Sequence, residues 1–120
     1  MAQVLIVDDQ SDIRRLLSIS LGKSYEILES EDGQTALDMV QQHSPKVVLL
    51  DVMMPGAMNG LDVLAAIKGN PRTAHIAVAM VSARGQPTDC EQADARGADA
   101  YFIKPFSPLQ VVAWVRQQID

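Results

Sequence analysis

Val47-Val-Leu-Leu-Asp51 decides the fold, because four consecutive apolar residues run directly into a carboxylate. A strand that is apolar at every position is buried on both faces, which is typical of a parallel sheet covered by helices on each side. The stretch Val4-Leu-Ile-Val7 has the same pattern and is followed at once by Asp8 and Asp9. The two runs therefore predict two buried strands of a parallel sheet, each ending in acids.

Helical stretches alternate with strands along the rest of the chain. Apolar residues at three- and four-residue spacing predict amphipathic helices, and we expect Ser11 and Ser107 to cap two of them. Thr88 with Glu91 predicts a capping box for another. The order of strand then helix, repeated five times with right-handed crossovers, predicts a three-layer, doubly wound (βα)5 domain of the α/β class. The expected strands cover residues 4–7, 25–30, 47–50, 76–81 and 100–103. The expected helices run from the Ser11 cap to 21, from 32 to 43, from 61 to 68, from the Thr88 cap to 96 and from 108 to 119.

The composition limits the class of protein. The chain has 120 residues, with ten Lys and Arg against fifteen Asp and Glu, a formal net charge of −5 and 48% hydrophobic residues. This length and apolar content predict a single folded domain over residues 1–120. The acidic balance argues against direct binding of nucleic acid or of an anionic membrane surface. No apolar run approaches the roughly 18–20 residues that a membrane span needs.

The two ends of the chain and its cysteine content indicate the compartment. The stretch after Met1 lacks the basic flank and small-residue cleavage site of a signal peptide, so we expect a cytoplasmic protein. Cys90 is the single cysteine, which excludes a disulfide within the chain. From the start at Met1 and the end of the last expected helix next to Asp120, we expect a complete protein without an output domain; a receiver cut from a longer protein stays open.

Polar side chains follow four of the five expected strands. Asp8 and Asp9 follow the first strand, Asp51 the third, Ser82 the fourth and Lys104 the fifth. Ligands of open parallel sheets bind at the carboxyl ends of the strands, so we expect these groups to converge there. A single Asp at a strand end is better explained as a cap of the next helix. The complete set favours a site for a hard cation such as Mg²⁺, which prefers oxygen ligands and phosphate.

The chain resembles a response-regulator receiver domain of two-component signalling, of the single-domain kind related to chemotaxis regulators. The resemblance extends over the whole length and implies a flavodoxin-like strand order of 2-1-3-4-5. It is carried by Val7-Asp8-Asp9, Leu50-Asp51, Met54-Pro55, Asn59-Gly60, Val81-Ser82-Ala83 and Lys104-Pro105-Phe106. One departure is the pair Gly56-Ala57 between Pro55 and Met58, where the family usually has one residue.

The resemblance implies a role for each acid of the site. Asp51 would accept a phosphoryl group from a phosphohistidine and would also be a ligand of Mg²⁺ or Mn²⁺. Asp9 would bind the cation directly and Asp8 mainly through water. The backbone carbonyl of Met53 would complete the protein ligands.

The resemblance also implies how the phosphoryl group is held and sensed. Lys104 would pair with the phosphoryl oxygens, and the Ser82 hydroxyl would move in to bind another of them. Tyr101 matches the aromatic residue whose rotamer follows phosphorylation, so Ser82 and Tyr101 would form the switch. The chain would phosphorylate and dephosphorylate itself without being an enzyme in the usual sense.

The resemblance further implies partner proteins. A histidine kinase or a histidine phosphotransfer protein would supply the phosphoryl group, and a downstream target protein would receive the signal. We expect no direct contact with nucleic acid or membrane, and a phosphorylation-dependent homodimer stays open. Cys90, Tyr101, Ile103 and Trp114 are the residues expected at the partner face, although Trp114 is also explained by packing against the edge of the sheet.

Two functions from other classes stay open. One is a phosphohydrolase that forms an aspartyl phosphate; such enzymes generally place a second acid two residues after the nucleophile, where this chain has Met53. The other is a receiver-like interaction module that is never phosphorylated. The presence of every chemical role in one chain argues against that module.

Overall fold

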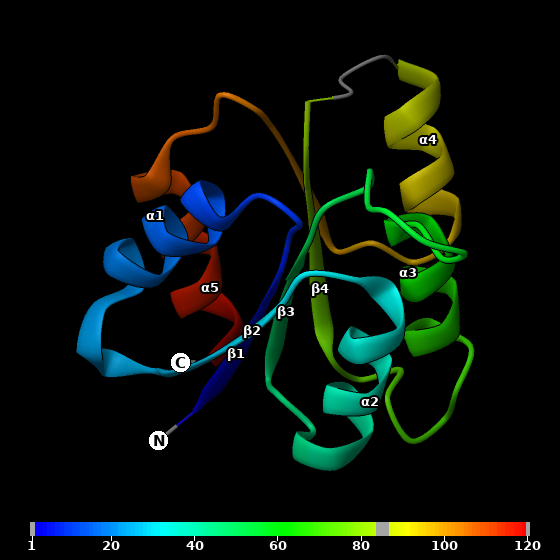
Figure 1. Cartoon of the computed structure of the whole chain (residues 1–120), viewed down its shortest axis with the longest axis horizontal. Coiled ribbons are helices and arrows are strands. Elements are labelled where there is room, and N and C mark those ends of the chain that lie inside the picture. The colour runs from blue at the N-terminus through cyan, green and yellow to red at the C-terminus, as the bar shows by residue number, and fades with distance from the viewer. Residues whose placement is uncertain (1, 84–86, 120) are drawn as a thin grey trace.

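The computed structural model describes residues 2–83 and 87–119 and has five parallel strands in one sheet. The strand order is β2-β1-β3-β4-β5, which confirms the predicted order and fold class. The chain alternates between the sheet and the helices on its two sides (Figure 1). The strands are β1 (Gln3–Val7), β2 (Glu26–Ser30), β3 (Val47–Leu50), β4 (Ala77–Ser82) and β5 (Ala100–Ile103).

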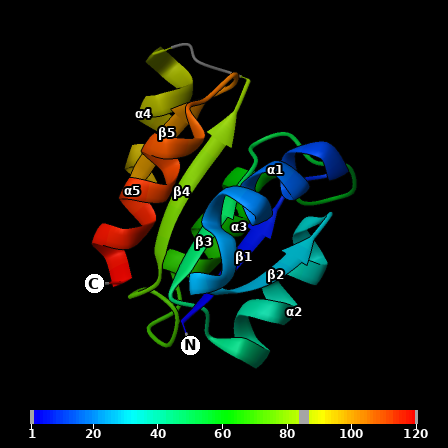
Figure 2. The same ribbon diagram turned by 90° about the vertical axis from the view of Figure 1, so that its left-hand side faces the viewer.

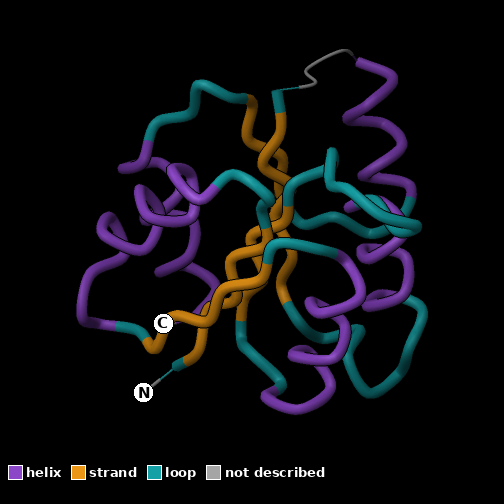
Figure 3. The backbone as a smooth tube through the Cα atoms, in the orientation of Figure 1, coloured by secondary structure: helices purple, strands orange, loops and turns teal. Residues whose placement is uncertain are grey.

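Helices cover both faces of the sheet. In Figures 1 and 2, α1 and α5 lie on one face, and α2, α3 and α4 lie on the other. Figure 3 shows the strands as the middle layer between these two groups. No described helix is long and apolar enough to cross a membrane. The helices are α1 (Ser11–Leu21), α2 (Gly33–His43), α3 (Gly60–Lys68), α4 (Pro87–Ala95) and α5 (Pro108–Ile119), with a short 3₁₀ turn, η1 (Gly22–Ser24), after α1.

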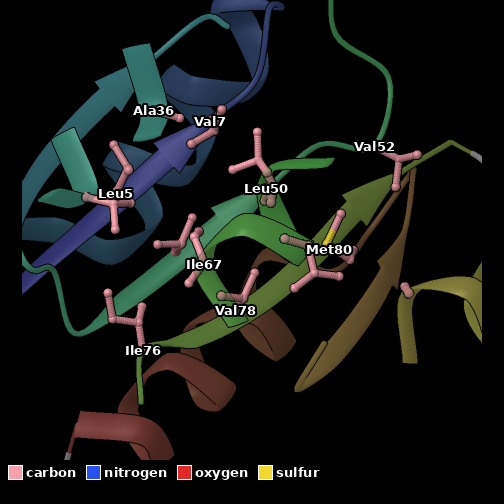
Figure 4. Close-up of a cluster of buried hydrophobic side chains, with 14 residues drawn as sticks. Leu5, Val7, Ala36, Leu50, Val52, Ile67, Ile76, Val78 and Met80 are labelled. Atoms are coloured by element: carbon pink, nitrogen blue, oxygen red, sulfur yellow. The ribbon is translucent and has the colours of Figure 1, made fainter. Parts of the chain in front are cut away.

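Successive residues of the central strands point to opposite faces and build two separate cores. In β1, Leu5 and Val7 pack under α2 and α3, whereas Val4 and Ile6 pack under α1 and α5. Figure 4 shows Leu5 and Val7 among the side chains of the first core, with Leu50 and Met80 of the neighbouring strands. Burial on both faces explains why these strands are apolar at every position.

The register of the strands brings their carboxyl ends to one edge of the sheet. Val7 of β1 lies opposite Leu50 of β3, and Leu50 lies opposite Met80 of β4. Beyond the last pair, the Asp51 N–H donates to the Val7 carbonyl at 2.9 Å. The acids that follow β1 and β3 are therefore held side by side by backbone hydrogen bonds.

Two of the predicted helix caps are wrong. Helix α1 begins at Ser11 and its N-cap is Gln10, whose carbonyl accepts the N–H groups of Ile13 and Arg14. The helix therefore starts too early for the Ser11 side chain to cap it. Thr88 lies inside α4, because Pro87 takes the first helical position, which suits proline.

Other helix starts behave as their sequences indicate. The Ser107 hydroxyl accepts from the Gln110 N–H at 3.4 Å, as predicted for α5. The Asp32 carboxylate accepts from the Thr35 N–H at 2.8 Å and caps α2. A capping box at Asn59 begins α3, and this cap was not among the predicted ones. Short polar side chains thus fix the starts of three helices.

A lysine joins three elements at the end of the sheet opposite the acids. Lys68, the last residue of α3, donates from Nζ to the carbonyl of Ile76 at 2.7 Å and of Ala74 at 3.2 Å. It also pairs with Asp99 Oδ2 at 3.0 Å, and the same oxygen accepts from the Val78 N–H at 2.8 Å. We call these contacts the Lys68 clamp. They tie the end of α3 to the start of β4 and to the loop before β5.

Lys68→Met should lower the free energy of unfolding by about 2 kcal/mol, because it leaves two carbonyls and a carboxylate without their charged donor. Urea unfolding followed by circular dichroism measures the change. The matched control is Lys23→Met in η1, an exposed lysine whose replacement should change stability by less than about 0.5 kcal/mol. Equal urea midpoints for the two variants would show that the clamp does not stabilise the fold.

Candidate functional site

Three carboxylates meet at the carboxyl edge of the sheet. Asp8 and Asp9 follow β1, Asp51 follows β3, and one oxygen of each lies within 4.8 Å of the others. Asp8 is 2% exposed and Asp51 4% exposed, whereas Asp9 is open to solvent. In the described part of the chain, this is the group of side chains suited to a metal ion. The structure therefore brings the predicted acids together.

Backbone and side-chain hydrogen bonds fix the buried acids. The Met53 N–H donates to Asp51 Oδ1 at 3.3 Å, and the Gln10 N–H donates to Asp8 Oδ1 at 2.9 Å. Arg14 of α1 donates from its guanidinium to the backbone carbonyl of Asp8 at 2.7 Å. Each strand end is thus held by the loop or helix that follows it.

Lys104 enters the cluster from the end of β5. Its Nζ lies 2.9 Å from Asp8 Oδ2 and 3.6 Å from Asp51 Oδ2. It also donates to Gln10 Oε1 at 3.1 Å. The side chain is only 13% exposed, so these oxygens are its main partners rather than water. The ammonium of Lys104 therefore lies next to two of the three carboxylates of the cluster.

The pKa of Asp51 is raised to about 6 in this environment. Burial of the carboxylate is the main cause, and the negative charge of Asp8 is the next. Lys104 and the Met53 N–H act in the opposite direction but do not cancel the rise. An all-oxygen donor set with excess negative charge fits Mg²⁺ or Mn²⁺ and does not fit zinc, which favours nitrogen and sulfur ligands.

Ser82 and Tyr101 lie close to this edge on neighbouring strands. Ser82 is the last residue of β4 and is fully buried, and its carbonyl accepts from the Lys104 N–H at 2.8 Å. Tyr101 of β5 lies opposite Met80 and is half-buried against the core under α2, α3 and α4. Both residues are therefore placed between the acid cluster and the β5 edge of the sheet.

The residues expected at the partner face belong to three elements, α4, β5 and α5. Cys90 of α4 and Tyr101 line a cavity of about 220 Å³ between α4 and β5. Ile103 at the end of β5 is 48% exposed. Trp114 packs edge-to-face against Phe102, with ring centroids 6.2 Å apart, in the core under α1 and α5. The structure thus brings Cys90 and Tyr101 together but gives Trp114 the edge packing that was its alternative explanation.

The loop after Asp51 depends on two glycines. Gly56, in the longer part of the loop, has a φ of 95°, which L residues with side chains rarely adopt. A Cβ on Gly60 would collide with the backbone carbonyl of Asp51, so only glycine lets α3 start against the end of β3. Met53 is 54% exposed at the mouth of the site.

Gln10 is a site residue that sequence reasoning missed. It lines a cavity of about 260 Å³ with Asp9, Asp51, Met53, Ala83 and Lys104. The available signal was its position: it follows the two acids directly and stands where a helix cap would normally be Ser, Thr, Asp or Asn.

Together, the doubly wound fold and the acid cluster with its lysine are the features of a class of signalling domain. The chain belongs to the response regulator receiver domain family, whose model matches residues 4–116. This confirms the resemblance, while the wider domain range of 1–120 stays a prediction. Receiver domains bind Mg²⁺ at an acidic pocket, and this chain has the acidic cluster.

Individual relatives agree with the family. The chain is 38% identical over 115 residues to the transcriptional regulatory protein SrrA of Staphylococcus aureus, covering 95% of this chain and 46% of that protein. It is similar to the chemotaxis protein CheY4 of Vibrio cholerae, with a TM-score of 0.89, 30% identity and 98% coverage of each chain. The BeF3-activated DrrB receiver domain gives a TM-score of 0.90 and 25% identity, covering 99% of this chain and 97% of that one.

The chain spans about half the length of the curated relatives it matches. Because SrrA is named as a transcriptional regulator, the comparison does not support the expectation that nucleic acid is no direct partner.

The raised pKa of Asp51 predicts a pH-dependent effect of Asp51→Asn in metal-free protein. Between pH 3.8 and about 6, Asp51 is more protonated in the folded state than in the unfolded state. As pH rises through this window, ionisation of Asp51 therefore lowers the stability of the fold. At pH 7 the variant should therefore be more stable than the wild type by about 2 kcal/mol, and at pH 4 the difference should nearly vanish.

Urea unfolding in EDTA at pH 4, 5, 6 and 7 measures this difference. Asp94→Asn on the exposed surface of α4 is the matched control and should follow the wild type across the range. A stability difference for Asp51→Asn that does not change with pH would contradict the prediction.

Proposed function

We propose that the chain is the phosphoacceptor switch of a two-component system or phosphorelay. Asp51 accepts a phosphoryl group from a phosphohistidine, and the resulting change in conformation signals to a partner protein. The observation that carries the proposal is the Asp51 carboxylate itself, which is buried beside two further acids and has the Lys104 ammonium 3.6 Å away. Membership of the receiver family supports the same conclusion.

The transfer is a displacement at phosphorus. A carboxylate oxygen of Asp51 attacks, the N–P bond of the phosphohistidine breaks, and the imidazole nitrogen leaves with the electron pair and takes up a proton. The product is an acyl phosphate on Asp51. Positioning and charge neutralisation carry most of the catalysis in such reactions, and Lys104 contributes both by pairing with the phosphoryl oxygens.

The acid cluster would hold a divalent cation, Mg²⁺ or Mn²⁺. We assign Asp9, Asp51 and the Met53 carbonyl as its direct protein ligands and Asp8 as a ligand through water. When bound, the cation neutralises negative charge on the transferring oxygens. Solvent access to Asp9 and Met53 supports entry of both the cation and the phosphoryl donor from this side.

Reading and erasing the signal involve residues next to the cluster. The Ser82 hydroxyl binds a phosphoryl oxygen, and Tyr101 changes rotamer as α4 rearranges. Hydrolysis of the acyl phosphate by water, which breaks the O–P bond and releases phosphate, restores the resting carboxylate. This self-phosphorylation and self-dephosphorylation would be the limit of the chain's own chemistry.

The partners follow from this chemistry. A histidine kinase or histidine phosphotransfer protein supplies the phosphoryl group, and a target protein binds the face that includes Cys90, Tyr101 and Ile103. We place the protein in the cytoplasm, where a single unpaired cysteine is ordinary. Trp114 is half-buried, and only its exposed part would belong to the proposed face. Self-association after phosphorylation is a separate outcome, which size-exclusion chromatography can detect.

The test is incubation with acetyl phosphate and Mg²⁺, followed by intact mass. The wild type should gain one phosphoryl group, and Asp51→Asn should gain none because the nucleophile is gone. Asp94→Asn is the matched control and should be modified like the wild type.

Each rival function has its own result. Multiple turnover of a phosphomonoester would favour the phosphohydrolase, for which Met53 offers no acid. A wild type that takes up neither a phosphoryl group nor beryllofluoride would favour the unphosphorylated interaction module. An adduct that survives in Asp51→Asn would overturn the assignment of the phosphoacceptor.

A further inference from the structure

Gln10 occupies the N-cap position of α1 without capping the helix. Its side chain makes no hydrogen bond to the first turn of α1, although Ser, Thr, Asp or Asn at this position would normally do so. Its backbone is held on both sides: its N–H donates to Asp8 Oδ1 at 2.9 Å, and its carbonyl accepts from Ile13 and Arg14 at 3.2 Å each. The backbone of Gln10 is therefore held in place, and its side chain, which does not cap the helix, can make a different contact.

The different contact is with Lys104. Gln10 Oε1 accepts from Lys104 Nζ at 3.1 Å, inside the cavity that also contains Asp51. Among the described residues, Asp8 and Asp51 also place a carboxylate oxygen near this ammonium, at 2.9 and 3.6 Å. Gln10 is thus the neutral acceptor among these described partners, and the two charged acceptors belong to the acid cluster.

The difference in charge matters once the acids are occupied. A divalent cation at the cluster repels the ammonium and competes for the same carboxylate oxygens. Lysine has a flexible stem of four carbons and gains rotamer entropy when released, so it would then leave the pocket unless another acceptor held it. The amide oxygen of Gln10 carries no formal charge and stays available in both conditions.

We propose that Gln10 is a positioning residue for Lys104, holding the ammonium inside the pocket until a phosphoryl oxygen replaces the amide oxygen as its partner. The proposal rests on the phosphoacceptor function assigned to Asp51. In this proposal, α1 starts without a side-chain cap because the Gln10 side chain holds Lys104 in position instead. Asn or Ser at position 10 would turn back to cap the helix and would be too short to reach Lys104.

Two variants separate positioning from structure. Gln10→Ser introduces a good cap and removes the acceptor, so its urea midpoint should rise while phosphorylation by acetyl phosphate at saturating Mg²⁺ slows by roughly two- to fivefold. Gln10→Met keeps the length of the side chain without the oxygen and should slow phosphorylation by a similar factor. Gln41→Met on the exposed surface of α2 is the matched control and should react like the wild type.

A double-mutant cycle assigns the effect to Lys104. In a Lys104→Ala background, Gln10→Met should cause no further loss of rate, because the group that Gln10 positions is absent. Nitrogen-15 NMR of the Lys104 ammonium in Mg²⁺-loaded protein, before any phosphoryl donor is added, gives a readout independent of the reaction. The signal should be restricted in the wild type and mobile in Gln10→Met.

The outcomes are distinct. A wild type that is not phosphorylated at all contradicts the proposed function and leaves the NMR comparison to decide the role of Gln10. Normal phosphorylation of both Gln10 variants with an unchanged Lys104 signal would overturn the inference. An equal loss of rate in the presence and absence of Lys104 would show that Gln10 acts through another group and would overturn it too.

Discussion

The hydrogen bond from the Asp51 N–H to the Val7 carbonyl, 2.9 Å long, joins the ends of β1 and β3 and so brings the acids that follow them into one cluster. Everything at the site depends on this register. A shift of one residue would point Asp51 to the other side of the sheet and away from Asp8 and Lys104. The packed cores on both faces make such a shift costly, because it would exchange the side chains of the two cores.

Features of the site lower the stability of the fold, and the two hydrophobic cores offset this loss. Asp51 is buried among like charges, and α1 starts without a side-chain cap. Both features lower the stability of the empty protein relative to a version optimised only for folding. Fully buried strands such as β3, with helices on each side, supply the hydrophobic stabilisation that offsets these losses. Receiver chemistry and folding therefore make opposite demands on the same strand ends.

Much of the fold and of the candidate site could be predicted from the sequence, because the sequence patterns that define them are local. Runs such as Val47 to Leu50 are typical of strands buried on both faces, and the polar residue after each run marks the sheet edge that carries the site. What could not be predicted depends on contacts distant in sequence. Lys68 and Asp99 are far apart in the chain and meet only in the folded protein. The position of Gln10 as cap, in place of Ser11, depends on backbone hydrogen bonds that no residue pattern specifies.

The Lys68 clamp lies at the amino ends of β4 and β5, at the opposite end of the sheet from the acids. It fastens α3, the start of β4 and the entry to β5 to one another. Loops at the carboxyl ends have no comparable fastening through Lys68. Ser82 and Lys104, at the carboxyl ends of the same two strands, lie instead next to the acid cluster. The clamp therefore divides β4 and β5 by role: their amino ends are anchored to α3, and their carboxyl ends carry the site.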